Sequence, residues 1–404
     1  MGRRVMAGLL DVDVALARLL DGEVSLPAET VDLGAARGRV LAGDLAALLT
    51  QPPFAASAMD GYAVRWDDLP GPWRVVGESA AGRGWSGTVE AGEALRIFTG
   101  APLPVGADTV VVQEEIERSG DTARLSGEGP PRLGANIRRA AQDFSMGDVL
   151  AATGERLTPA RIGLLAAGGH GSARVVQRPR VTLIATGDEL VPPGTMPGAH
   201  QIVSSNGVML RALFESVGGA VDDPGIVPDR REALAAALSK ARGDVVVTIG
   251  GASVGDHDLV VPVLRDLGAE MDFWKLALRP GKPMLAGRLG SKRVIGLPGN
   301  PVSAYVCALL FVVPLLCRMG GRAEGLPTRR LPLGSALPAN GMRRDYMRGQ
   351  VTDGRADAFS SQDSALLGRL AAAQVLIVRL PGAPAAEPGE IVDCIALDSI
   401  GDVP

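Results

Sequence analysis

The pattern of apolar and polar positions differs between the two halves of this chain. The second half has the clearer succession of strand-like and helix-like segments. From Pro179 to Cys317, short apolar runs separate segments in which apolar residues recur every three or four positions. The run Val245–Ile249 is almost entirely β-branched and apolar, as is typical of parallel strands covered on both faces. This succession predicts a doubly wound parallel α/β domain of about 140 residues. We expect strands at Val181–Ala185, Val221–Val227, Val245–Ile249, Phe273–Leu276, Met284–Ala286 and Val294–Leu297, and helices at Gly207–Ser216, Arg230–Ala241, Leu259–Leu267 and Val302–Cys317.

The first 178 residues have a different texture. Helical spacing at Val12–Leu20 and Asp32–Leu49 resumes at Arg156–Gly169, and the sequence between is rich in Gly and Pro. That intervening sequence carries short β-like pieces at Trp73–Val76, Leu95–Phe98 and Thr109–Val112. We therefore predict a multidomain α/β fold. A discontinuous helical domain would comprise residues 1–50 and 137–178, a β-rich insertion residues 51–136, the α/β domain residues 179–325, and a β-rich C-terminal domain residues 326–404.

Composition narrows the class of protein. The 404 residues are 46% hydrophobic and 21% charged, with a net charge of −4, which favours a soluble globular protein and argues against broad nucleic-acid binding. The apolar run Val302–Cys317 is shorter than a membrane span and contains Pro314, so we expect a buried helix and no membrane partner. Cys307, Cys317 and Cys394 form neither a zinc pattern nor a disulfide framework, and this predicts a cytoplasmic protein.

One motif suggests a hydrolase and fails on its context. Gly251–Gly255 reads GASVG and matches the nucleophile elbow of α/β-hydrolases between a strand and a helix. That fold needs a histidine later in the chain, and the only later histidine is His257, within the same loop. We therefore expect Ser253 to donate a hydrogen bond to a ligand and not to act as a nucleophile.

Several loops that follow the predicted strands contain acidic residues, basic residues and glycines that could form one binding site. In a parallel sheet these loops meet at the carboxyl edge, where ligands bind. Cations and glycine N–H groups suit a phosphate or another oxyanion, and neighbouring acids suit Mg²⁺ that bridges the phosphate. Lys275 or Arg279 alone could equally be a solvated surface charge, but the joint set favours an anion-and-metal site. The set comprises Glu189, Asp229, Gly250, Gly251, Ser253, Gly255, Asp258, Lys275, Arg279, Lys282, Pro298 and Asn300.

Eight motifs occur in order along the chain: SAMDGYA (Ser57–Ala63), RIFTGAPLPVGADTVV, GANIR, TGDEL, SNG, GGASVGDHD, FWKLALRPGKP and GLPGNPVSA. Together they closely resemble a known family, the molybdopterin molybdenumtransferases (bacterial MoeA and the C-terminal domain of gephyrin). The resemblance covers nearly the whole chain. It implies a homodimer of four-domain protomers that takes adenylylated molybdopterin and molybdate, cleaves the pyrophosphate with Mg²⁺, releases AMP and inserts molybdenum into the dithiolene. It also implies transient contact with molybdopterin adenylyltransferase.

The resemblance further implies roles for individual residues. Asp229 and Asp258 would hold Mg²⁺, while Arg348 and Ser364 would bind molybdate. Lysine is frequent in the family where this chain has Arg279, so the positive charge is kept but its geometry differs. The catalytic set would be Asp60, Thr99, Glu189, Asp229, Asp258, Lys275 and Arg279, with Gly250, Gly251, Ser253, Gly255, Lys282, Pro298, Asn300, Arg348 and Ser364 binding substrate.

Two other functions remain open at this point. A gephyrin-like scaffold would bind partner peptides without catalysis, but the acids and cations are intact. The related adenylyltransferase shares the α/β domain, but the β-rich insertion and tail disfavour it. AMP release, ATP consumption or neither would discriminate among the three.

Overall fold

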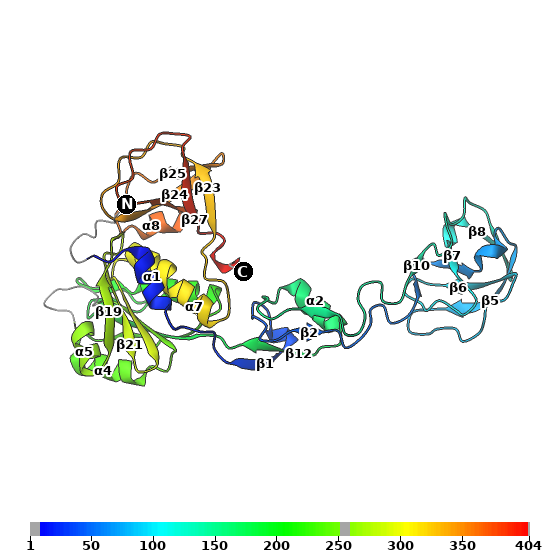
Figure 1. The fold of residues 1–404 in the computed structure, drawn as a ribbon, viewed down its shortest axis with the longest axis horizontal. Coiled ribbons are helices and arrows are strands. Elements are labelled where there is room, and N and C mark those ends of the chain that lie inside the picture. The colour runs from blue at the N-terminus through cyan, green and yellow to red at the C-terminus, as the bar shows by residue number, and fades with distance from the viewer. Residues whose placement is uncertain (1–8, 251–258, 403–404) are drawn as a thin grey trace. The chain divides into compact units, whose positions relative to one another are not determined.

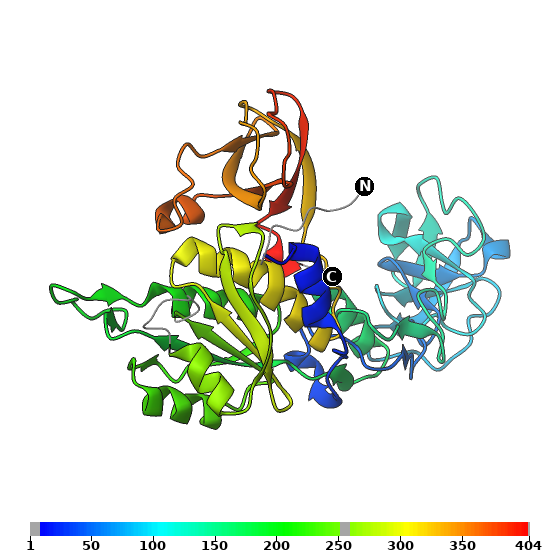
Figure 2. The same cartoon turned by 60° about the vertical axis from the view of Figure 1, so that its left-hand side comes forward.

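The computed structural model describes residues 9–250 and 259–402, which form two compact units (Figures 1 and 2). Unit 1 comprises residues 9–29, 38–42 and 174–402, and unit 2 comprises residues 30–37 and 43–173. The four predicted domain boundaries stay a prediction.

Unit 1 is built on a mixed sheet with helices on both faces, which confirms the predicted α/β class. Its first four strands in spatial order are parallel, and the last two run as an antiparallel extension. The strands are β16 (Ala220–Asp222), β13 (Arg180–Thr186), β18 (Val245–Ile249), β22 (Lys292–Leu297), β21 (Pro283–Leu289) and β19 (Glu270–Lys275), with β17 (Ile226–Val227) also beside β13.

The antiparallel extension departs from the purely parallel sheet that we predicted. A two-residue turn at Gly290–Ser291 joins β21 to β22, and so short a turn can only connect antiparallel strands. Because β19 is antiparallel to β21 in turn, β19 again runs parallel to β22. The second reversal returns the end of β19 to the same edge as the ends of β13, β18 and β22.

Alternating side chains of the sheet enter two apolar layers. Val245 and Val247 of β18 pack on one face, and Val246 packs on the other. The first face is covered by α1 (Val12–Leu20), α3 (Ser205–Ser216) and the long helix of residues 301–319; the second is covered by α4 (Arg231–Lys240) and α5 (Val260–Asp266). The helix α1 therefore belongs to the core of unit 1.

The long helix comprises α6 (Pro301–Cys307), a π-helical stretch at Ala308–Val312 and α7 (Val313–Met319). The π stretch lies just before Pro314, which has no N–H to donate to the preceding turn. This is the one described helix long and apolar enough to cross a membrane, and 89% of its most apolar window is buried inside the protein. It is a core helix, as the sequence predicts.

The rest of unit 1 is the predicted β-rich C-terminal region, and one of its strands pairs with the α/β part of the chain. Its six-stranded sheet packs on its own apolar cluster and carries the short helix α8 (Leu367–Ala371). The sheet contains β20 (Leu278–Arg279), β24 (Arg344–Thr352), β26 (Val375–Arg379), β27 (Ile391–Ala396) and β23 (Thr328–Pro332), with β25 (Arg355–Ala358) beside β24.

Unit 2 centres on a six-stranded sheet with a small apolar cluster on each face. The three β-like pieces predicted in this region are strands. The sheet order is β7 (Thr109–Val112), β4 (Gly61–Val64), β6 (Glu93–Ile97), β5 (Trp73–Ser79), β9 (Thr122–Leu125) and β8 (Ile116–Ser119). Unit 2 also contains α2 (Pro159–Ala167), and the strand pairs β2 (Leu45–Ala46) with β11 (Val149–Ala151) and β3 (Ala56–Ser57) with β10 (Ile137–Arg138).

Two element predictions are wrong. The segment Asp32–Leu49 contains no α-helix but the end of β1 (Ala28–Asp32), a 3₁₀ turn at Leu33–Ala35 and β2. Gly38 has φ +74°, outside the helical region. The single strand predicted at Val221–Val227 is two strands, β16 and β17, separated by residues 223–225, where Gly225 has φ +91°.

Candidate active site

The carboxyl ends of the parallel strands bring two of the predicted acidic segments together. The Thr186 hydroxyl, at the end of β13, donates to the Asp229 carboxylate, which follows β17. The Asp229 backbone N–H in turn donates to Oδ1 of Asp188 at 3.1 Å. Asp188, Glu189 and Asp229 are all solvent-exposed. Carboxylate oxygens therefore face water beside two adjacent strand ends.

Gly250 connects the end of β18 to its two neighbours in the sheet. Its N–H donates to the Leu297 carbonyl at 3.1 Å, and its φ is +89°. A Cβ at this position would lie 2.9 Å from the Thr186 carbonyl oxygen. Glycine is thus required both by the backbone angle and by the close approach of β13. The following predicted residues (Gly251, Ser253, Gly255 and Asp258) lie outside the described residues.

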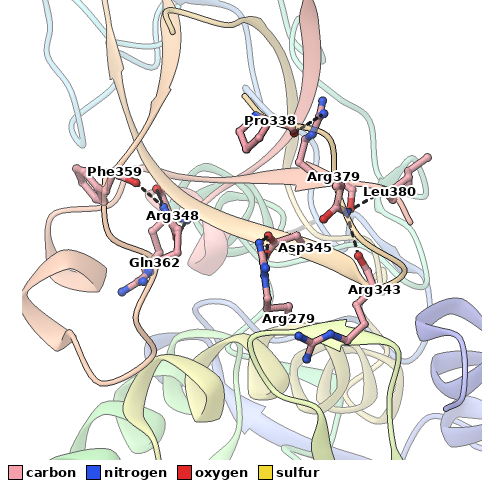
Figure 3. A network of polar contacts seen from close by, with 10 residues as sticks. Arg279, Pro338, Arg343, Asp345, Arg348, Phe359, Gln362, Arg379 and Leu380 are labelled. Atoms are coloured by element: carbon pink, nitrogen blue, oxygen red, sulfur yellow. Dashed lines mark hydrogen bonds and ion pairs between the residues drawn. The ribbon is translucent and has the colours of Figure 1, made fainter. Parts of the chain in front are cut away.

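The predicted cationic segment starts at the same edge, where β19 ends in Lys275. Lys275 is half-buried, and Lys282 is exposed. The backbone N–H of Leu276 donates to the Lys282 carbonyl at 3.0 Å, so the segment folds back on itself. Arg279 lies within this bend and donates through Nε and Nη2 to Oδ2 of Asp345 (Figure 3). The carboxylate raises the pKa of the Arg279 guanidinium, chiefly through these hydrogen bonds.

A residue of the C-terminal region completes the edge at the end of β22. Pro298 is buried, and Asn300 is the N-cap of α6. The Asn300 side-chain amide donates to the Ser364 hydroxyl at 3.0 Å, and the Val302 N–H donates to the Ser364 carbonyl at 3.1 Å. Asn206 of α3 donates to the Gly299 carbonyl at 2.7 Å. Ser364, which the family resemblance implies as a molybdate ligand, therefore lies at the N-terminus of the core helix.

Arg348 is buried and hydrogen-bonded within the protein, whereas a residue that binds an oxyanion directly is expected to have an exposed guanidinium. It is 1% exposed, and its guanidinium donates to the carbonyls of Asp363 and Leu366 at 3.0 and 3.2 Å. Burial lowers the pKa of this guanidinium. Gln362 holds the Arg348 backbone with two hydrogen bonds, at 2.9 and 3.0 Å (Figure 3). Arg348 therefore supports the two ends of the loop that carries Ser364.

Asp60 and Thr99 belong to unit 2, and the structure brings these two predicted residues into contact. Oδ1 of Asp60 accepts from the Thr99 N–H and hydroxyl at 2.7 and 2.8 Å. These bonds lower the pKa of the Asp60 carboxyl. Arg96 stands beside the pair, with its guanidinium 5.2 and 4.6 Å from the Tyr62 and Phe98 ring centres. Thr99 thus holds the Asp60 carboxylate in one position beside the β-rich sheet.

Sequence reasoning did not single out two residues of this network, Asp345 and Gln362. Asp345 is 3% exposed and lies within a strand, where a buried carboxylate requires a cationic partner. An acidic residue within an otherwise apolar strand therefore points to an ion pair. The sequence alone does not say which Lys or Arg is the partner. Gln362 lies two residues before Ser364, and its contacts with the Arg348 backbone have no signature in the sequence.

The arrangement at the edge in unit 1 suits an oxyanion and a hard cation together. Lys275, Arg279 and Lys282 supply positive charge, and the positive end of the dipole of the continuous helix that begins at Pro301 lies at the same edge. The exposed carboxylates of Glu189 and Asp229 offer the oxygen ligands that Mg²⁺ prefers. Within residues 9–250 and 259–402, no group of three or more His, Cys, Asp or Glu side chains could hold a metal by itself. Mg²⁺ commonly binds to one or two carboxylates together with substrate phosphates, so the donor chemistry fits.

Comparison with known families matches almost the entire chain. The model of the MoeA N-terminal region (domains I and II) matches residues 10–169, that of a probable molybdopterin-binding domain matches residues 182–318, and that of the MoeA C-terminal region (domain IV) matches residues 330–397.

Individual relatives agree with these matches. The chain is 35% identical over 354 residues to the molybdopterin molybdenumtransferase of Haemophilus influenzae, covering 84% of this chain and 86% of that protein. It is 37% identical over 337 residues to the Nostoc enzyme of the same name, covering 80% and 77% of the two chains. The crystal structure of the molybdopterin biosynthesis MoeA protein from Pyrococcus horikosii superposes with a TM-score of 0.81 at 31% identity, covering 96% and 99%.

Proposed function

The chain belongs to the MoeA family, and from that membership we propose how its strand-end site works. It is a molybdopterin molybdenumtransferase, a transferase of molybdenum cofactor biosynthesis. We propose that it takes adenylylated molybdopterin and molybdate, hydrolyses the phosphoanhydride bond so that water adds to phosphorus and AMP leaves, and inserts molybdenum into the dithiolene of the pterin to give molybdenum cofactor. The observation that carries this proposal is the hydrogen bond from Asn300 to Ser364, because it joins a C-terminal hydroxyl to the edge that also carries the cations.

The cationic segment would stabilise the bond cleavage. As the phosphoanhydride breaks, negative charge builds on the departing AMP phosphate. Lys275, Arg279 and Lys282 would neutralise that charge, since preorganised cations stabilise a transition state more than solvent water does. Gly250 leaves room for the backbone to approach the phosphate, and Ser253 would donate to the pterin or phosphate.

Magnesium is proposed as the metal of the reaction, with Asp229 and Asp258 as its carboxylate ligands and Glu189 beside them. When bound, Mg²⁺ would neutralise phosphate charge and orient the anhydride. The Thr186 hydroxyl holds one oxygen of Asp229 and would keep the other oriented toward the strand edge.

Molybdate would bind where the Ser364 loop meets α6. Molybdate is a tetrahedral dianion, and hydroxyl, amide and helix N-terminal N–H donors suit it. Ser364 and Asn300 would supply the side-chain donors, while Arg348 would act by holding the Ser364 loop and adding positive charge behind it. Pro298 would restrict the backbone of the turn that leads from β22 into α6.

A homodimer is proposed because Asp60 and Thr99 lie in unit 2 and would act on a site in unit 1 of the partner. The surface of unit 2 supports association, since Leu48, Leu49, Met146 and Val149 are each more than half exposed. The Leu48–Leu49 and Met146–Val149 segments lie side by side through β2 and β11. An exposed apolar patch of this kind marks an interaction surface.

The location and the substrate source are also proposals. Cys307, Cys317 and Cys394 are buried and unoxidised, which is typical of a cytoplasmic protein. Adenylylated molybdopterin is the product of molybdopterin adenylyltransferase, so transient contact with that enzyme would hand over a reactive substrate.

The deciding experiment is incubation with adenylylated molybdopterin, Mg²⁺ and molybdate, followed by measurement of AMP. We expect AMP release from the parent chain and none from Asp258→Asn, with pterin binding retained. Asp266→Asn is the matched control, because Asp266 is an exposed acid at the other end of α5, paired with Arg231. Consumption of ATP in place of AMP release would indicate an adenylyltransferase, and neither activity would indicate a scaffold.

A further inference from the structure

Arg279 is held by one edge of its guanidinium. Nε donates to Oδ2 of Asp345 at 2.8 Å, and Nη2 donates to the same oxygen. The Asp345 side chain is 4% exposed, whereas the Arg279 side chain is 52% exposed. A buried carboxylate thus binds a side chain that is half exposed, and Figure 3 shows the two side chains pointing toward one another.

The backbone also fixes Asp345 relative to Arg279. Strands β20 and β24 are parallel neighbours, and Arg279 pairs directly with Asp345 in their register. The Arg344 N–H donates to the Ala277 carbonyl at 2.9 Å and extends this ladder. Both residues of the ion pair are therefore placed by main-chain hydrogen bonds as well as by their side chains.

A guanidinium can serve two anions at once because its five N–H donors form a rigid planar fork. In the described part of the chain, Arg279 has no hydrogen bond through Nη1. That nitrogen, with the outer N–H of Nη2, forms the adjacent edge of the guanidinium, which is available to a second anion. A lysine ammonium is a point charge and has no comparable second edge.

We propose that Asp345 is a positioning residue for the reaction: it holds the Arg279 guanidinium edge-on, so that the free edge meets the phosphate charge of the substrate. This inference rests on the proposed function, since it assigns the anion to adenylylated molybdopterin. The raised pKa of Arg279 agrees with the strength of its contact with Asp345.

The first test separates kcat from KM for AMP release. Asp345→Asn removes the charge that fixes Arg279 but keeps the size of the side chain. We expect kcat to fall about tenfold, because displacement of a catalytic group by about 1 Å costs up to 10²-fold. KM for adenylylated molybdopterin should stay the same or fall, because the variant site is more positive by one charge.

The neighbouring residue on β24 supplies the matched control. Arg344 binds Asp13 of α1 with two hydrogen bonds of 2.6 and 2.7 Å, so Asp13→Asn also removes a charged partner of β24. If Asp345 acts only by holding this strand, both variants should lose kcat alike, and that result overturns the proposal. We expect Asp13→Asn to keep kcat within about twofold of the parent. The melting temperatures of both variants show whether either substitution destabilises the whole protein.

A second test uses the chemistry of the cation. In an Arg279→Lys background, Asp345→Asn should change kcat by less than about twofold, because an ammonium needs no edge-on fixing. The same tenfold loss in both backgrounds would show that Asp345 acts without Arg279 and would sink the inference.

Failure of the proposed function can be told apart from failure of this inference. If the parent chain releases no AMP, the reaction assignment fails, and the Arg279 Nε–H NMR signal decides about positioning. Slow solvent exchange in the parent and in Asp13→Asn, with fast exchange in Asp345→Asn, supports a fixed guanidinium. Fast exchange in the parent overturns it.

Discussion

Oδ1 of Asp60 accepts two hydrogen bonds from one residue, Thr99, through its backbone N–H at 2.7 Å and its hydroxyl at 2.8 Å. The two bonds favour the ionised carboxylate and lower its pKa. Asp60 and Thr99 are far apart in the chain, and the pairing of β4 with β6 brings their loops together. The contact joins two separate candidate residues into one hydrogen-bonded unit.

We predict that Thr99→Val raises the pKa of Asp60. The backbone bond remains, and the hydroxyl bond to the ionised form is lost. Because the folded-state pKa is depressed, any contribution of the ionised carboxylate is present at neutral pH and disappears as the pH falls through that pKa. In the variant, the acid limb of the AMP-release profile should therefore move to higher pH. An NMR titration of the Asp60 carboxyl checks the shift directly.

Unit 2 contains a matched control for this substitution. Oδ1 of Asp44 accepts from the Thr153 N–H and hydroxyl, both at 2.7 Å, and its pKa is lowered in the same way. Thr153→Val should raise the pKa of Asp44 and leave the acid limb of activity in place. A shift of that limb in both variants would mean that Asp60 has no special part in the reaction.

We predict that Arg348→Ala affects molybdate binding through the Ser364 loop. Removal of the guanidinium takes a charged donor away from the Asp363 and Leu366 carbonyls, which keep only their backbone N–H donors, and this should lower the free energy of unfolding by about 1–3 kcal/mol. The molybdate concentration for half-maximal activity should rise about tenfold, while AMP release persists at high molybdate. An unaltered molybdate response would contradict the assignment.

Gln362→Leu tests whether this effect passes through the loop. Gln362 binds the backbone of Arg348 and of Phe359, and the variant keeps the Arg348 guanidinium. We expect the half-maximal molybdate concentration to rise in the same direction as in Arg348→Ala. If only Arg348→Ala changes it, Arg348 touches molybdate itself.

Gly250→Ala should destabilise the protein more than an ordinary turn glycine would. Gly290 has φ +61° and open space around a Cβ, so Gly290→Ala carries only the backbone cost of about 1–2 kcal/mol. Gly250→Ala adds a Cβ at 2.9 Å from the Thr186 carbonyl oxygen, which should add at least about 1 kcal/mol. Urea unfolding compares the two, and equal losses would refute the close approach.

Removal of Mg²⁺ should stop AMP release and leave the fold intact. The described candidate acids, Glu189 and Asp229, are solvent-exposed, so their repulsion without metal is screened by water and salt. We expect EDTA to abolish AMP release, excess Mg²⁺ to restore it, and the folding temperature to change little. Activity that survives EDTA would eliminate the metal role.

Helices and strands that are determined by a local hydrophobic pattern are predicted accurately, and segments whose conformation depends on distant contacts are not. The helix at Val12–Leu20 and the strand at Val245–Ile249 match the structure to the residue, because their hydrophobic period requires no distant partner. Asp32–Leu49 has helical spacing but includes Gly34, Gly38 and Gly43, and the backbone there follows neighbouring strands instead. The segments after β13, β18 and β22 could be expected at one edge, because the alternation of strands and helices sets the direction of these strands. The end of β19 reaches the same edge through two antiparallel reversals that the hydrophobic pattern does not reveal.

The sequence by itself determined the family, the α/β class and the strand-end segments that carry the cations and acids, since these depend on residue type, order and local period. Only the tertiary structure decided which charges meet. It paired Arg279 with Asp345, committed Arg348 to the carbonyls of the Ser364 loop, and joined Asp60 to Thr99. The physical reason is that a charge or hydroxyl bonds with whatever the folded chain places within about 3 Å. That distance is set by strand register and packing between segments far apart in the chain.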